Sequence, residues 1–439
     1  MTSPNPSAPK RLTSQDLMRL KKYLSDNLLR ALEMEGIPTG ERNAFIQKNI
    51  LHVLEQTKIK LPEDIQKHIF AQVLDDMLGY GPIQPLLDDP EVSEIMVNGP
   101  KKIFVEKNGQ LTKSDVAFDD DDHVIRVIDR IILPLGRRVD FDSPTVDARL
   151  PDGSRVNAVV RPVAIDGPSI TIRKFRKDKL QVEDLVEYGS LTRQMADFLQ
   201  ACVKARFNIV ISGGTGSGKT TLLNVMSGFI PENERIITIE DAAELQLQQD
   251  HVMRMETKPA NADGHNAVTI RDLVKNSLRM RPDRIVVGEV RSGEALDMLQ
   301  AMNTGHDGSL TTVHANAPRD AISRIETLVL MAGMDLPLKV VRQQISSAVD
   351  LIVQQTRLKD GQRKVTSVTE VAGMEGDIIV LTDIFKFVQT GVTTEGKVLG
   401  EVNATGIRPN FTPRLEAAGF KLSADIFAPK SSPNPNSRR

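Results

Sequence analysis

A glycine-rich stretch, Gly213–Thr220, separates an apolar run from a segment with helical character. Its sequence, GGTGSGKT, matches the pattern G-x-x-x-x-G-K-[ST] of a phosphate-binding loop. Ile209–Ile211 is the apolar run that enters the stretch, and Thr221–Phe229 is the helix expected to leave it. The alternative is a glycine-rich surface turn, but a chance match to the pattern is expected in only about one per cent of chains of this length. The order of strand, glycine turn and helix therefore predicts an α/β domain.

The residue types in this stretch suit a triphosphate and a metal ion. Glycines let the backbone wrap closely around phosphates, while backbone amides and the positive end of the following helix attract the anion. Lys219 is expected to reach the terminal phosphates, and Thr220 to offer its hydroxyl to Mg²⁺. The cofactors predicted here are therefore ATP and Mg²⁺. The residues expected to bind the nucleotide are Gly213, Gly214, Thr215, Gly216, Ser217, Gly218, Lys219, Thr220 and Thr221.

Hydrolysis also needs a carboxylate that holds the metal or orients water, and two apolar runs end in one. Arg284–Val287 is followed by Gly288 and Glu289, and Ile236–Ile239 is followed by Glu240. Gly288 stands where many phosphate-loop ATPases have a metal-binding Asp. Ligands of parallel sheets bind beyond the carboxyl ends of the strands, so Glu240 and Glu289 are expected beside the loop. The alternative for Glu240 is an acid at a helix N-terminus.

Two histidines bracket another apolar run, Leu310–Val313. We expect His306 and His314 near the same edge, where either could sense phosphate or position water. The alternative for each is a surface histidine or a hydrogen-bonded core histidine. A zinc site is excluded, because neither a cysteine nor a third ligand stands at metal-site spacing.

Changes in composition and periodicity divide the 439 residues into segments. The ends are rich in Pro, Ser and Asn and are expected to be disordered. Three helices are expected next, beginning at Thr13, near Ile46 and at Pro62. The predicted organisation is a disordered tail (1–12), a three-helix segment (13–78), an α+β domain (79–180), a linker (181–190), an ATPase domain with a parallel sheet (191–430) and a second disordered tail (431–439).

Inside these domains, turn residues separate short apolar runs. The strands expected in the α+β domain are Ile95–Val97, Ile103–Glu106, Val146–Leu150, Arg155–Val160 and Ser169–Phe175, with a helix over Asp121–Leu133. The strands expected in the parallel sheet are Asn208–Ser212, Arg235–Glu240, Arg284–Gly288 and Leu310–Val313. Leu351–Thr382, with a turn at Lys359-Asp360-Gly361, is expected as appended antiparallel strands.

Charge and composition narrow the function classes. The 56 basic and 58 acidic residues nearly cancel, which argues against bulk nucleic-acid binding. Cys202 is the one cysteine, so no internal disulfide forms. No apolar run approaches the ~20 residues that span a bilayer, and the N-terminus lacks the apolar stretch of a secretory signal. A cytoplasmic protein with at most peripheral membrane contact is expected.

The stretch from Leu278 to Met331, which contains RPDRIVVGEVR and AMNTGHDGSLTTVHANAPRDAISR, resembles the type II/IV secretion ATPases. Within them it is most similar to the CpaF/TadA branch, the assembly ATPases of Flp (tight adherence) pili, and the resemblance spans roughly residues 75–430. The family's glycine before the Walker B glutamate corresponds to Gly288. Its four motifs, Walker A, Asp box, Walker B and His box, correspond to Gly213–Thr220, Ile239–Leu247, Arg284–Arg291 and Thr304–His314.

This resemblance implies homo-hexamers whose subunits carry a PAS-like N-terminal domain and a RecA-like ATPase domain. It also implies that arginines of the N-terminal domain approach the phosphates. The candidates are Arg149, Arg155, Arg161 and Arg173, of which Arg155 and Arg173 look most like the family's nucleotide-facing pair. The alternative is that they are solvated cations on a strand face. Arg279 and Arg291 flank the Walker B strand and are expected either to tie subunits together or to orient acids.

The implied function is that of a hexameric motor. ATP hydrolysis is expected to power assembly, or in the opposite direction retraction, of a type IVc/Flp pilus or related secretion across the inner membrane. The expected partner is a platform protein of the inner membrane, with the ATPase docked on its cytoplasmic face. Glu289 is expected to hold the metal through water and Glu240 to polarise the attacking water. Two alternatives stay open, a nucleic-acid translocase with a RecA-like core and a nucleotide-gated scaffold, whereas a small-molecule kinase is disfavoured because no lid or acceptor-site signal is found.

Overall fold

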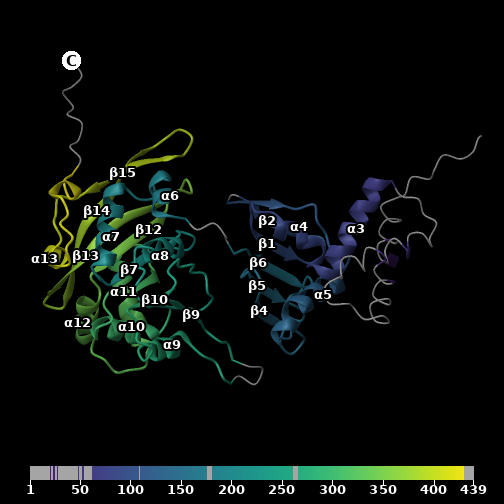
Figure 1. The fold of residues 1–439 in the computed structure, drawn as a ribbon, viewed down its shortest axis with the longest axis horizontal. Helices are drawn as coiled ribbons and strands as arrows, with labels where there is room; N and C mark the ends of the chain where they lie inside the picture. Colours follow the sequence, from purple (N-terminus) through teal and green to yellow (C-terminus); the bar gives the residue numbers. More distant parts are fainter. Residues whose placement is uncertain are drawn as a thin grey trace, which may run out of the picture. The chain divides into compact units, whose positions relative to one another are not determined.

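The protein is described from a computed structural model, which covers residues 20, 23, 24, 27, 48, 52, 53, 62–107, 109–175, 180–260 and 265–429. The chain divides into two compact units, Met1–Lys177 (unit one) and Asp178–Arg439 (unit two), shown in Figure 1. Both predicted disordered tails lie outside the described residues. The linker expected over 181–190 instead contains helix α6 (Val182–Glu187), because Leu185 is buried in the core of unit two.

The third predicted helix is present as α3 (Glu63–Leu78), which follows Pro62. Most of the first two predicted helices lies outside the described residues. Leu20 and Leu24 are nevertheless helical, and they are buried together with Ile69 and Val73 of α3. This cluster joins two residues of the first predicted helix to α3. No helix in the described part of the chain is both long and apolar enough to cross a membrane.

Unit one is built on an antiparallel sheet. Its six described strands follow the order β3-β2-β1-β6-β5-β4. Helix α5 packs its apolar side, which includes Val124, Val127 and Ile128, on the apolar side of the sheet. The elements are α4 (Gln84–Asp88), β1 (Val92–Asn98), β2 (Ile103–Lys107), β3 (Gln110–Lys113), α5 (Asp121–Ile132), β4 (Thr145–Arg149), β5 (Arg155–Val159) and β6 (Ser169–Arg173).

The predicted strands and the predicted helix of this α+β region are confirmed within a few residues at each end. Strand β3 was not predicted, because all four of its residues are exposed and show no apolar alternation. It forms by pairing with β2 across a turn in which Gly109 has a φ of 78°. Backbone pairing, and not burial, therefore defines this edge strand.

Unit two contains a nine-stranded sheet over its described residues, in the order β15-β14-β13-β12-β7-β11-β10-β8-β9. The strands from β12 to β9 in this order run parallel, which confirms the parallel pairing predicted for four of them. The strands are β7 (Ile209–Gly213), β8 (Ile236–Glu240), β9 (Val252–Glu256), β10 (Arg284–Val287), β11 (Leu310–His314), β12 (Leu351–Arg357), β13 (Arg363–Glu375), β14 (Ile378–Val392) and β15 (Val398–Ala404).

Helices cover both faces of this sheet, as Figure 1 shows. Successive residues of a strand point to opposite faces, and β7 shows the consequence. Ile209 and Ile211 join a core with α7 and α8, whereas Val210 joins a second core with α9 to α12. The central strand, β7, is therefore packed between two hydrophobic cores. The helices are α7 (Arg193–Lys204), α8 (Lys219–Ser227), α9 (Ile270–Ser277), α10 (Glu294–Asn303), α11 (Pro318–Leu330), α12 (Leu338–Ala348) and α13 (Thr412–Ala417).

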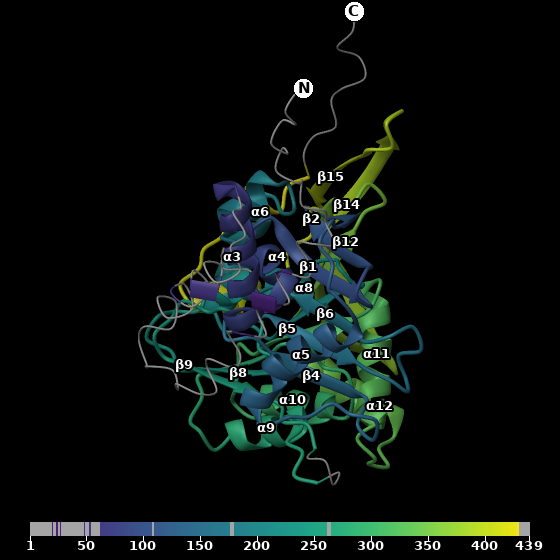
Figure 2. The same cartoon turned by 90° about the vertical axis from the view of Figure 1, so that its right-hand side faces the viewer.

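The antiparallel strands predicted after Leu351 are confirmed as β12, β13 and β14, but β12 is not an appendage. It also pairs in parallel with β7 and so lies inside the sheet. The reason is that Leu351–Gln355 is buried on both faces. Strands β14 and β15 continue the sheet as a hairpin that projects beyond the rest of unit two in both views (Figures 1 and 2).

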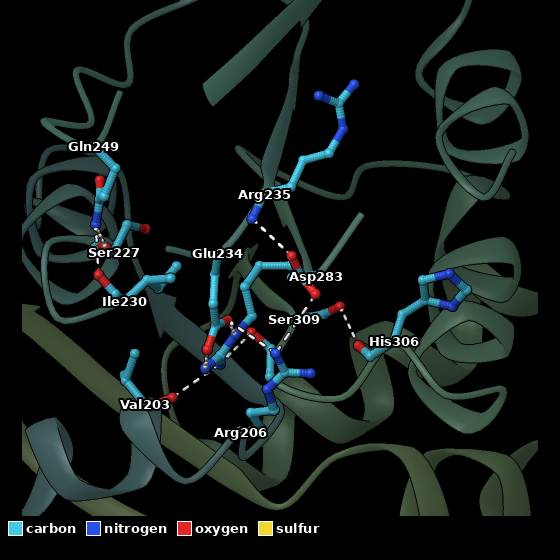
Figure 3. A network of polar contacts seen from close by, with 12 residues as sticks. Val203, Arg206, Ser227, Ile230, Glu234, Arg235, Gln249, Asp283, His306 and Ser309 are labelled. Carbon is cyan, nitrogen blue, oxygen red and sulfur yellow. Dashed lines mark hydrogen bonds and ion pairs between the residues drawn. The ribbon is translucent and has the colours of Figure 1, made fainter. Parts of the chain in front are cut away.

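A buried ion-pair network lies at the end of the sheet where the parallel strands begin (Figure 3). Arg284, the first residue of β10, is fully buried, and its Nε donates to Glu234 at 2.5 Å. It also donates to the carbonyl oxygens of Val203 and Gly308 at 2.9 and 3.3 Å. Gly308 has a φ of 82°, and a Cβ there would lie 1.9 Å from Nη1 of Arg284. Glycine, which has no Cβ, therefore fits at position 308, whereas a residue with a side chain would clash with Arg284.

We predict that Arg284→Met destabilises the protein by about 3–5 kcal/mol, because it leaves the Glu234 carboxylate buried without its main partner. The double variant Glu234→Leu/Arg284→Met should recover part of this loss, since both charges are then removed. Arg206→Gln is the control, because Arg206 contacts the same carboxylate at 3.4 Å but its side chain is 44% exposed. Urea unfolding measures all three, and a loss below about 1 kcal/mol for Arg284→Met would contradict the network's structural role.

Candidate functional site

The glycine-rich loop connects β7 to α8 at the carboxyl edge of the parallel sheet. Gly216 and Gly218 have φ values of 67° and 97°, in the left-handed region that glycine adopts without strain. The Ser217 hydroxyl donates to the Gly214 carbonyl at 2.9 Å and so closes the loop on itself. The backbone thus forms a compact turn in front of the helix N-terminus, which suits an anion.

Lys219 begins α8, and its Nζ donates to the Gly214 carbonyl at 3.1 Å. Burial lowers the pKa of Lys219, whereas the nearby Glu289 carboxylate acts to raise it. The ammonium group therefore lies across the loop, within the electrostatic reach of an acid from another strand. Thr220 is half-buried and Thr221 is exposed in the first turn of the same helix.

The two predicted acids lie at adjacent strand ends. Strands β8 and β10 pair with Ile239 opposite Val287, so Glu240 and Gly288 follow side by side. A Cβ at residue 288 would lie 2.8 Å from Cγ of Glu240. Gly288 therefore leaves the room that the Glu240 side chain occupies, which explains why no larger residue stands there.

Glu240 is only 3% exposed. Its Oε2 accepts hydrogen bonds from the backbone amides of Glu244 and Leu245 at 2.7 and 3.0 Å. Its Oε1 is buried and accepts no hydrogen bond from the described residues. Burial raises the pKa of Glu240 from 4.5 to about 7, against the lowering effect of the two amides. A carboxyl group with one unpaired oxygen and this pKa can exchange a proton with water near neutral pH.

Glu289 stays partly exposed and is held by an arginine. Arg291 donates to Glu289 at 2.9 Å and to Asp241 at 3.1 Å. This guanidinium thus links the acidic ends of β8 and β10. Of the two roles expected for Arg291, the contacts within this chain fit the orientation of acids.

His314 lies beside the loop. It ends β11 directly opposite Gly213 of β7, and its Nε2 is 2.8 Å from the Thr215 hydroxyl. Thr312 lies two residues before His314 on the same strand, and its hydroxyl donates to the Gly288 carbonyl at 2.7 Å. Strand β11 therefore connects the loop to the acid-bearing strand.

The expectation that His306 lies at this edge is wrong. His306 precedes the five-residue strand β11, whereas His314 ends it. A strand rises ~3.3 Å per residue, so the two ends of β11 are about 13 Å apart. The His306 carbonyl accepts from Ser309, and Figure 3 shows this pair beside the Arg284 network. His306 thus belongs to the amino edge of the sheet.

Arg155 and Arg173 lie in unit one and are both exposed. They stand directly opposite each other on β5 and β6, and Arg149 of β4 stands opposite Arg155. Residues that face each other across antiparallel strands share one side of the sheet. The structure therefore brings three of the candidate arginines into one row.

Two further arginines and a glutamine lie at the loop and were not predicted. Gln355 of β12 is aligned with Gly213. Arg363 of β13 donates its Nε to the Gly216 carbonyl at 3.0 Å, and Arg357 is its cross-strand partner. Residues 216 and 363 are 147 positions apart, so no local motif joins them. The available signal was the apolar run Leu351–Val353, which could have been assigned to the parallel sheet.

A family model and curated proteins of similar sequence both match this chain over most of its length. Residues 76–379 match the family model described as type II/IV secretion system protein. The chain is 36% identical over 293 residues to the conjugal transfer protein TrbB of Rhizobium radiobacter, covering 66% of this chain and 86% of that protein. It is 32% identical over 299 residues to the type IV secretion system protein VirB11 of Brucella suis, covering 62% and 83%.

Among solved structures, the VirB11 ATPase of the Brucella suis type IV secretion system, in complex with sulphate, is 30% identical. That match covers 66% of this chain and 92% of the VirB11 chain, with a TM-score of 0.37. The family model spans the loop, both acids and His314. The chain belongs to the type II/IV secretion system protein family.

Proposed function

We propose that the chain hydrolyses Mg-ATP at the carboxyl edge of the unit-two sheet. The observation that carries this proposal is the register of the parallel strands. The Lys219 ammonium, the Glu289 carboxylate and the Glu240 oxygen that has no partner among the described residues lie at one edge of this sheet. A cation for the phosphates and acids for metal and water are the groups that ATP hydrolysis needs.

The residues present fit Mg²⁺. The described residues contain no group of three or more His, Cys, Asp or Glu able to hold a metal by themselves. Mg²⁺ in nucleotide sites takes most of its ligands from phosphates and water and few from protein. Thr220 and, through water, Glu289 would hold it. When bound, it neutralises charge on the phosphates.

In this proposal Glu240 prepares the attacking water. Its Oε1 accepts a hydrogen bond from that water, while the amides of Glu244 and Leu245 fix the carboxylate. Lys219 leaves the Gly214 carbonyl and binds the terminal phosphates instead. His314, fixed by Thr215, reports whether the last phosphate is present.

We infer further that the chain is a subunit of a hexameric motor of the CpaF/TadA type. The motor would drive Flp pilus assembly or retraction, or related secretion, from the cytoplasmic face of the inner membrane through a platform protein. Support comes from the family match and from relatives named for conjugal transfer and type IV secretion. Arg155 and Arg173 of unit one would approach the phosphates when nucleotide binds. A motion of this kind is biased by different affinities for the ATP and ADP states.

Glu289→Gln is expected to keep ATP binding but to lower turnover by roughly 100-fold or more, because the metal-holding charge is lost. Lys219→Ala should lose both binding and turnover. Glu232→Gln and Lys204→Ala are matched controls, because both residues are exposed and lie away from the carboxyl edge of the parallel sheet. Phosphate release and nucleotide titration measure the effects. Normal turnover in Glu289→Gln would refute the assigned role.

Glu240→Gln should stop turnover and yet stabilise the protein at pH 8. The raised pKa means that the folded state binds more protons than the unfolded state, so wild-type stability falls as pH rises from 4.5 to about 7. The neutral amide avoids this cost, which we expect to be about 1–3 kcal/mol. Urea unfolding should show the gain at pH 8 and little gain near pH 4.5. An equal gain at both pH values would show that ionisation of Glu240 is not its cause.

Arg155→Gln/Arg173→Gln is expected to reduce turnover at least about 100-fold with little loss of ATP affinity, because such arginines act on charge developed during transfer. Arg126→Gln is the control, since Arg126 is exposed on α5 of the same unit. The rate of single-turnover ATP hydrolysis is compared between the full-length wild-type protein, the double variant and the control. If the double variant hydrolyses ATP at the wild-type rate, the row of arginines has another role.

A further inference from the structure

The hairpin of β12 and β13 lies against the middle of the glycine-rich loop. Strand β12 is aligned with β7 as far as Gln355 and Gly213, and it then continues to Arg357 while β7 turns into the loop. Arg363 donates its Nε to the Gly216 carbonyl at 3.0 Å. A Cβ on Gly216 would lie 3.7 Å from Nη1 of Arg357. Both guanidinium groups therefore flank Gly216.

The turn that joins these strands is well fixed. The Leu358 amide donates to the Gln362 carbonyl at 2.7 Å. The Asp360 carboxylate accepts from the Gln362 amide at 3.0 Å and from the Val398 amide of β15 at 2.7 Å. The two arginines are thus presented by paired strands tied to a third strand, which suits a binding site that needs fixed geometry.

The position of β12 in the sheet indicates which part of a nucleotide these arginines meet. Strand β7 lies between β12 on one side and β11, β10 and β8 on the other. His314, Glu289 and Glu240 all belong to the second side, and the Glu289 charge acts on Lys219. A triphosphate whose last phosphate meets these groups directs its α-phosphate and nucleoside toward β12.

The chemistry of the hairpin suits that end of the nucleotide. A guanidinium stacks on the face of an aromatic base and donates paired hydrogen bonds to phosphate. Arg357 and Arg363 stand directly opposite each other, and like charges in that position repel. A base or an anion bound between them offsets the repulsion. We propose that Arg357 and Arg363 bind the nucleoside and the α-phosphate, which deepens the proposed ATP site and rests on it.

Inorganic tripolyphosphate provides the decisive test, because it has the phosphates of ATP without the nucleoside. Calorimetric titration of the full-length Arg357→Gln/Arg363→Gln protein with Mg-ATP, Mg-ADP and Mg-tripolyphosphate gives three affinities. We expect the affinities for ATP and ADP to fall by the same factor, roughly tenfold, and the affinity for tripolyphosphate to fall by a smaller factor, roughly threefold, because tripolyphosphate keeps a phosphate in the α-position but has no nucleoside. Lys359→Gln is the matched control on the same hairpin, exposed at its turn, and should change none of the three.

Three outcomes overturn the proposal: unchanged ATP affinity, equal weakening of ATP and tripolyphosphate, or weakening of ATP and tripolyphosphate with unchanged ADP affinity. The second would assign the arginines to the phosphates without the nucleoside, and the third to the terminal phosphate. A wild-type protein that binds none of the three ligands would refute the proposed function instead. If loss of the Arg363 bond to the loop unfolds the double variant, Arg357→Gln alone carries the same comparison, since Arg357 is exposed.

Discussion

The parallel pairing of β7 with β11 and β12 determines where the functional groups of unit two lie. Ile209 stands opposite both Leu310 and Leu351, so Gly213, His314 and Gln355 lie side by side at the carboxyl edge. A slip of one residue would turn each buried side chain to the other face, and the two cores that clamp β7 prevent it. Packing of the apolar residues thus fixes the geometry of the polar ones.

Two buried charged side chains, one at each edge of this sheet, differ in how well their polar atoms are paired. At the amino edge, the buried Arg284 has a carboxylate partner and two carbonyl partners. At the carboxyl edge, one buried oxygen of Glu240 has no hydrogen-bond partner among the described residues, and burial raises the pKa of this carboxyl group to about 7. A buried carboxyl group of this kind lowers the stability of the folded state, which proteins accept where function requires it. The contrast supports a structural role for Arg284 and a chemical role for Glu240.

Much of unit two could be predicted because its signals are local. Continuous apolar runs predicted β7, β8, β10 and β11, and the strand-end rule then placed Glu240 and Glu289 together. The same rule should have separated His306 from His314, because one precedes β11 and the other ends it.

Other features depend on residues far apart in the sequence and could not be predicted. Gly288 is explained only by the Glu240 side chain beside it, and Gly308 only by the Arg284 guanidinium. The approach of Arg363 to Gly216 requires β12 to be placed next to β7, whereas the sequence suggested an appended strand. One-dimensional patterns give the elements, and the order of strands in the sheet decides which elements meet.

The most direct test of this account is a crystal structure of the full-length protein with Mg²⁺ and a non-hydrolysable ATP analogue. The account predicts that the γ-phosphate contacts the Lys219 ammonium, that the metal lies beside Thr220, and that a water on Oε1 of Glu240 faces the γ-phosphorus. A triphosphate bound away from the Gly213–Thr220 loop, or a Glu240 carboxylate facing away from it, would contradict the assignment of this edge as the site of hydrolysis.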